Sequence, residues 1–61
     1  METIKQVLMR RDDMTASEAD ELIAEAREEM QDRITAGDLS GAEEICYEYF
    51  GLEPDYLMEL I

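Results

Sequence analysis

The segment from Thr15 to Gly37 constrains the fold more than any other part of this chain. It contains no proline and no internal glycine, and residues that favour helix, above all alanine and glutamate, dominate it. Thr15 and Glu18 have the spacing of a capping box, and Gly37 can adopt the left-handed conformation that ends many helices. We therefore expect one long amphipathic helix over this segment.

One side of this expected helix is apolar. At about 100° per residue, six apolar side chains gather on one stripe. A stripe of this kind packs against other elements, so we expect shorter helices to cover it. Its members are Ala19, Leu22, Ile23, Ala26, Met30 and Ile34.

The opposite side carries six acids within about 100° of arc and about 21 Å of helix axis. Acids three or four residues apart stand about 5–6 Å from each other, and each such pair repels by roughly 0.2–0.5 kcal/mol. Arg27 and Arg33 can relieve only part of this repulsion, and the face lacks the mixed signs of an ordinary soluble surface. The candidate partner-binding acids are Glu18, Glu21, Glu25, Glu28, Glu29 and Asp32.

The segment before the long helix predicts a short helix over residues 2–11. Its C-terminal end is basic, which suits the helix dipole. We expect Arg10 and Arg11 to pair with acids of the long helix. Its apolar positions follow helical spacing, namely Ile4, Val7 and Leu8.

The segment after Gly37 predicts two further helices. Either Asp38 or Ser40 caps a third helix that ends at Gly51. Pro54 is well placed in the first turn of a short fourth helix, and we expect the apolar Ile61 to be docked. The buried stripe of the third helix is expected to contain Ala42, Ile45, Cys46, Tyr49 and Phe50.

The length of 61 residues allows one domain, so residues 1–61 are expected to form a single helical domain. The predicted class is all-α, a compact bundle of three to four short helices around one long amphipathic helix. A chain this short buries only about 60% of its unfolded surface. It therefore needs tight packing, self-association as a homodimer, or a partner.

The net charge is -12, from 17 acids and 5 bases. Residues 1–11 hold three bases and one acid, a net charge of +2, which leaves -14 for residues 12–61. Such charge argues against direct binding to nucleic acid or to an anionic membrane. It favours a basic protein surface as the partner.

The chain lacks histidine, the commonest metal ligand and a frequent general acid or base. Its single cysteine, Cys46, lies on an apolar stripe. We therefore expect no enzyme activity, no metal site and no cofactor. A lone cysteine, the absence of an apolar run of about 18 residues and the absence of a secretion signal favour a cytoplasmic protein.

The helices before and after Gly37 have the outline of a helix-turn-helix, but the would-be recognition helix carries acids and no base, which excludes DNA reading.

Tyr47 is a second candidate for partner binding. Tyrosine is enriched at protein interfaces, and partial packing against a neighbouring helix is the alternative for this side chain. The acids that flank it are Glu43, Glu44 and Glu48.

The C-terminal segment YFGLEPDYLMELI, residues 49–61, resembles the ending of a group of small acidic proteins of unknown function from phages and mobile elements. The Met14-Thr15 step into a Glu/Ala-rich helix and the later Gly37-Asp38 pair are similar too. The likeness covers most of the chain and carries no catalytic residue. It implies a phage or prophage setting.

Two functions fit this pattern. In the first, the acids imitate nucleic-acid charge and inhibit a host nucleic-acid-binding defence protein, such as a restriction or CRISPR nuclease. One helix offers a charge per about 3–4 Å of axis, whereas duplex DNA has one per roughly 1.7 Å, so a second acidic surface or a dimer is needed. In the second, the chain is a structural or regulatory homodimeric module and its acids only keep it soluble.

Overall fold

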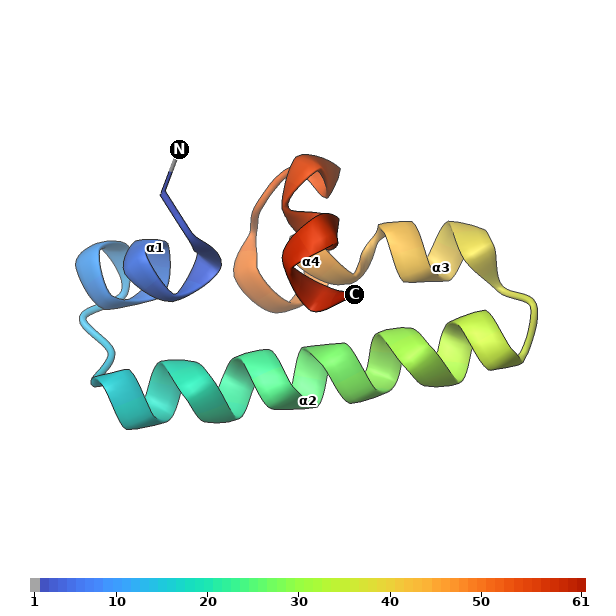
Figure 1. Ribbon diagram of the computed structural model, residues 1–61. Helices are drawn as coiled ribbons and strands as arrows, with labels where there is room; N and C mark the ends of the chain where they lie inside the picture. Colours follow the sequence, from blue (N-terminus) through green and yellow to red (C-terminus); the bar gives the residue numbers. More distant parts are fainter. Residues whose placement is uncertain (1) are drawn as a thin grey trace.

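The computed structural model describes residues 2–61, which form four α-helices and a C-terminal 3₁₀ helix. One long helix runs along one side of the molecule, and all the shorter elements pack against the other side of it (Figure 1). This arrangement confirms the expected all-α class. In chain order the elements are α1 (Ile4–Arg11), α2 (Ala16–Thr35), α3 (Leu39–Glu43), α4 (Ile45–Phe50) and η1 (Pro54–Leu60).

The long helix α2 begins and ends on the signals that the sequence contains. The Thr15 side chain accepts the backbone N–H of Glu18 at 3.1 Å, and the Glu18 carboxylate accepts the backbone N–H of Thr15 at 2.9 Å. These reciprocal bonds make a capping box and satisfy two helix-end donors. Gly37 has a φ of 81°, which only glycine adopts without strain, and it reverses the chain.

The inner side of α2 supplies small residues to the core. Ala19 and Ala26 have no exposed surface, so neighbouring helices can approach the α2 backbone closely. Met30 is buried with them, whereas Ile34 is 46% exposed, contrary to its expected place in the buried stripe. Ile34 and Leu39, which is 63% exposed, line one open hollow that the other elements among residues 2–61 do not fill.

The core is entirely apolar in the part of the chain that the structure describes. No polar or charged residue among residues 2–61 is buried. α1, α2 and α4 each contribute three buried residues to the core, whereas α3 and η1 contribute one each. Its largest fully buried side chains are Phe50, Ile4, Leu8, Ile45, Leu60 and Cys46.

The predicted third helix is two helices. A turn at Glu44 separates α3 from α4, and there the Glu44 N–H donates to the Gly41 carbonyl at 3.2 Å, three residues back rather than four. The cap is Asp38 and not Ser40, because an Asp38 carboxylate oxygen accepts the Gly41 N–H at 2.9 Å. The helix therefore starts earlier than a cap at Ser40 would place it.

The C-terminal segment is held by Leu60 and Glu59 and not by Ile61. Pro54 opens η1, as predicted for a short helix, but Ile61 is 89% exposed, so the docking expected of it is wrong. Leu60 is fully buried instead. A Glu59 carboxylate oxygen also accepts the Ile4 N–H at 3.1 Å, which ties η1 to the first turn of α1.

The bases of α1 do not behave as the sequence suggested. Arg10 and Arg11 pair within their own segment, with Glu2 at 2.7 Å and Asp12 at 2.8 Å. Lys5 instead pairs with Asp20 of α2, at 3.1 Å. The reason is geometric, since Arg10 and Arg11 project about 140° and 120° away from Lys5 around the helix.

Candidate functional site

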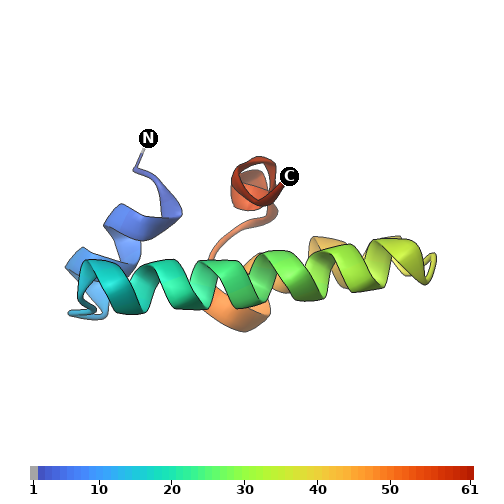
Figure 2. The same cartoon turned by 60° about the horizontal axis from the view of Figure 1, so that its bottom comes forward.

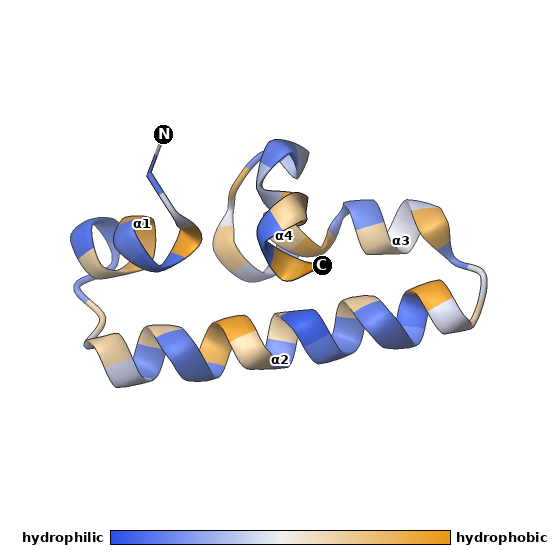
Figure 3. Cartoon of the chain, in the orientation of Figure 1, coloured by the Kyte–Doolittle hydropathy of each residue, from blue (hydrophilic) through white to orange (hydrophobic). Residues whose placement is uncertain are grey.

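The six acids predicted on α2 share one side of that helix, which we call the acidic face: Glu18, Glu21, Glu25, Glu28, Glu29 and Asp32. Five of them are exposed and Glu29 is partly buried. No other helix crosses in front of α2 in the turned view of Figure 2. Hydrophilic residues run along much of its length in Figure 3. The neighbouring helices therefore leave the acidic face uncovered.

Most of these carboxylates have no cationic partner in residues 2–61. Glu29 is the exception, since Arg33 Nε lies 3.2 Å from its Oε1. Glu18 belongs to the capping box of α2, and the hydrogen bonds it receives from Thr15 lower its pKa. The acids with neither an ion pair nor a hydrogen bond among the described residues are Glu21, Glu25, Glu28 and Asp32.

Four of the five bases interact with groups outside the acidic face, and Arg33 is the exception. Lys5, Arg10 and Arg11 have the partners described above, none of which belongs to the acidic face. Arg27 turns away from the acids and lies 3.3 Å from the backbone carbonyl of Glu59, to which it donates. The charge of the acidic face is therefore mostly left in place.

Tyr49 lies at the edge of the acidic face. Together with four of the acids it lines a shallow hollow of about 270 Å³. The sequence placed Tyr49 in the buried stripe, but it is only partly buried. A tyrosine at the margin of a stripe can bury its ring and keep its hydroxyl in water, which is the signal that could have located it. The acids of this hollow are Glu25, Glu28, Glu29 and Asp32.

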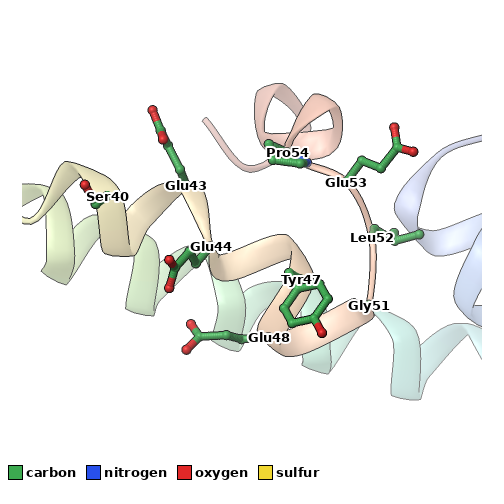
Figure 4. Close-up of a pocket in the computed structure, with 9 residues that line it drawn as sticks. All are labelled: Ser40, Glu43, Glu44, Tyr47, Glu48, Gly51, Leu52, Glu53 and Pro54. Carbon is green, nitrogen blue, oxygen red and sulfur yellow. The ribbon is translucent and has the colours of Figure 1, made fainter.

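A second acidic surface surrounds Tyr47, which is 75% exposed. It is an open groove of about 920 Å³ between α3, α4 and the start of η1, and Figure 4 shows Tyr47 and Glu48 on α4 with Pro54 across from them. We call it the acidic groove. Its lining residues are Ser40, Glu43, Glu44, Tyr47, Glu48, Gly51, Leu52, Glu53 and Pro54.

Arg33 joins the two acidic surfaces. Its guanidinium lies 3.2 Å from Glu29 on the acidic face and 2.6 Å from Glu48 in the acidic groove. It also donates to the Gly41 carbonyl at 2.7 Å. The hydrogen bonds to these carboxylates raise the pKa of Arg33, so the guanidinium stays charged. The acidic face and the acidic groove therefore adjoin at one shared cation.

Three other features of the described chain bear on function: its cysteine, its possible metal ligands and the apolar character of its helices. Cys46 is buried, and burial, together with the negative charge of Glu59, raises the pKa of its thiol, which keeps the thiol neutral. No grouping of acids and cysteine in residues 2–61 has the arrangement of a metal site. In the same range, no helix has both the length and the apolar character needed to cross a bilayer.

Comparisons with protein-family models, with curated proteins and with solved structures found no match for this chain. The fold and its surface define a small acidic all-α domain that carries two adjoining carboxylate surfaces.

Proposed function

We propose that this chain is a protein-binding module, not an enzyme, whose carboxylates take the place of nucleic-acid phosphates in the basic groove of a partner. One observation carries the proposal: Glu21, Glu25, Glu28 and Asp32 stand side by side without a cationic partner in residues 2–61. Their mutual repulsion works against folding. A basic partner would turn that repulsion into attraction.

The acidic groove supports the proposal through charge density. Duplex DNA presents a charge per roughly 1.7 Å of axis, which the acidic face alone does not match. The groove adds four carboxylates beside the face, and Tyr47 offers an aromatic ring for a lysine or arginine. These four are Glu43, Glu44, Glu48 and Glu53.

The partner class follows from charge and from the resemblance to phage and mobile-element proteins. A net charge of -12 opposes contact with nucleic acid itself and with anionic lipid. A host nucleic-acid-binding defence protein, of the restriction or CRISPR nuclease type, offers the basic groove that the carboxylates would fill. In this proposal the protein acts in the cytoplasm as an inhibitor, without metal or cofactor.

A homodimeric structural or regulatory module is the second candidate. It is favoured by the exposure of apolar side chains on the side of α2 away from the acidic face. A dimer formed there would leave both acidic faces outward. The residues concerned are Ile34, Leu39 and Ile61.

Affinity capture with displacement by DNA tests the main proposal. The wild-type chain and the variant Glu21→Gln/Glu25→Gln/Glu28→Gln are immobilised and exposed to a host lysate at low and at high salt. We expect the wild type to retain a nucleic-acid-binding protein at low salt, and duplex DNA to displace it. The variant should lose the protein, because three of the unpaired charges are gone.

A matched variant separates local from total charge. Asp13→Asn/Asp20→Asn/Asp55→Asn removes the same number of charges outside the acidic face, so it should still capture the partner. If both variants lose capture equally, or if duplex DNA fails to displace the captured protein, the mimicry proposal is wrong. Homodimers in sedimentation velocity, with no capture, would favour the second candidate.

A further inference from the structure

Exposed apolar side chains converge at one place in the fold. Residues 2–61 expose six large hydrophobic side chains, and three of them meet at one hollow although they come from three different segments. Ile34 comes from the last turns of α2, Leu39 from the start of α3, and Ile61 from the residue after η1. A convergence from three elements is a shaped surface, not a scatter of single apolar residues.

This apolar hollow has two parts, of about 220 Å³ and about 210 Å³, that share lining residues. Met30, Ile34 and Ile61 line both parts. The side chains that line them include a single acid, Glu43, and no base. The hollow can therefore receive an aliphatic side chain with one charged side chain, the exposed Glu43, beside it.

The hollow is continuous with the acidic groove. Glu43 lines both of them, so a segment seated in the hollow would have its flanking residues over the carboxylates of the groove. Arg27 is the base on the same side of α2, one turn before Gln31, and it donates to the Glu59 carbonyl. The hollow and the groove together are lined by four acids and by no base; the acids are Glu43, Glu44, Glu48 and Glu53.

We propose that the apolar hollow and the acidic groove together dock a basic amphipathic helix of a partner protein. An aliphatic side chain of that helix fills the space between Ile34, Leu39 and Ile61. Lysine or arginine residues one turn away lie over Glu43 and its neighbours in the groove. Helices that place apolar anchors at helical spacing into a groove are a common mode of peptide recognition.

Charge selects this occupant over a second copy of the chain. Each copy carries a net charge of -12, so a partner copy would bring more carboxylates to the rim that Glu43 occupies. Like charges across an interface weaken it and suppress the wrong partner. A basic helix meets the same rim with opposite charge.

Two synthetic peptides of one composition test this inference. Both contain leucine and lysine, but only one places its leucines at helical spacing on a single face, and the other has a scrambled order. We expect the amphipathic peptide alone to bind, measured by fluorescence anisotropy. It should shift the backbone amide resonances of Ile34, Leu39 and Ile61 in nuclear magnetic resonance spectra.

Exposed-site variants locate the contact. Ile34→Gln/Leu39→Gln should weaken peptide binding about tenfold, as loss of an interface anchor does. Met9→Gln, a matched change at an exposed apolar side chain of α1, should leave binding unchanged. Circular dichroism checks the fold of each variant, and Leu39→Gln alone replaces the double variant if that does not fold.

Three results would overturn the inference. They are equal binding of the scrambled peptide, unchanged binding by the Ile34 and Leu39 variants, and wild-type dimers that these variants abolish. The inference shares the carboxylates of the acidic groove with the proposed nucleic-acid imitation, but it does not rest on the acidic face. The variant Glu21→Gln/Glu25→Gln/Glu28→Gln should still bind the amphipathic peptide while it loses a DNA-binding partner, so the failure of one proposal is distinguishable from that of the other.

Discussion

The inner and outer sides of α2 belong to one helix but have opposite roles. The inner side buries Ala19, Ala26 and Met30 against the other elements, and the outer side holds the acidic face in solvent. The contrast shows how so small a chain can carry so much charge. The buried residues of α2 are gathered on one side, so most of the charged residues on the other side stay exposed.

The first and largest effect should come from the inner side. Met30→Ala should cost about 2–5 kcal/mol, because it removes a buried side chain and leaves a cavity. A chain of this size seldom has more than about 3–5 kcal/mol to lose. Urea unfolding followed by circular dichroism measures the change. Glu28→Ala on the outer side is the control, and an equal loss there would contradict the division of roles.

The second effect concerns the residue that starts the helix. Thr15→Ala should cost about 0.5–2 kcal/mol, because the Glu18 N–H loses its side-chain acceptor. The midpoint of thermal unfolding reports the loss. Ser17→Ala, a change in the exposed first turn, is the control. Equal unfolding midpoints for the two variants would mean that the Thr15 cap does not stabilise the helix.

The third effect has the opposite sign. Glu21→Gln/Glu25→Gln/Glu28→Gln should leave stability unchanged or raise it, by roughly 0.2–0.5 kcal/mol for each like-charge pair removed. Any gain should shrink in high salt, which screens exposed charges. The same urea titration at two salt concentrations measures it. A clear loss of stability would mean that the outer side supports the fold after all.

The smallest effect is a pH dependence at Glu18, the one acid that belongs both to the acidic face and to the helix cap. Its pKa in the folded chain lies below the ordinary value of 4.5. The stabilisation of the folded chain by the ionised Glu18 carboxylate is therefore complete above pH 4.5, and it is lost as pH falls through the lowered pKa. Urea midpoints measured below pH 4.5 should fall more steeply for wild type than for Glu18→Gln, and parallel curves would refute this role.

Local signals made the long helix predictable. The capping box of Thr15 and Glu18, the left-handed turn at Gly37 and the period of the apolar residues all depend on neighbours within a few positions. The same period located the acidic face. These features could be predicted because they need no knowledge of how the helices pack.

Tertiary features were not predictable in this way. The exposure of Ile34 and Ile61 depends on where the covering elements stop, and the partners of Arg10 and Arg11 depend on how α1 is rotated against α2. The break at Glu44 arises from a three-residue hydrogen bond that competes with the regular helical one. None of these is encoded in spacing alone.

The features of the candidate site also divide into those that local sequence predicts and those that depend on tertiary packing. The members of the acidic face and the exposed Tyr47 follow from helical period. The place of Tyr49 beside the acids and the shared ion pairs of Arg33 do not, because they join α2 to α4.

The single guanidinium of Arg33 sets how the molecule would receive a cation from outside. Because Glu29 and Glu48 are already turned toward one point, an arriving lysine or arginine meets oriented oxygens and has less side-chain freedom to remove. The arriving group also competes with a resident cation, so occupancy at this junction would be an exchange of one positive charge for another and not a simple addition. Under the proposed function, such exchange would favour partners whose cations arrive in numbers, as they do along a surface that holds a phosphate backbone.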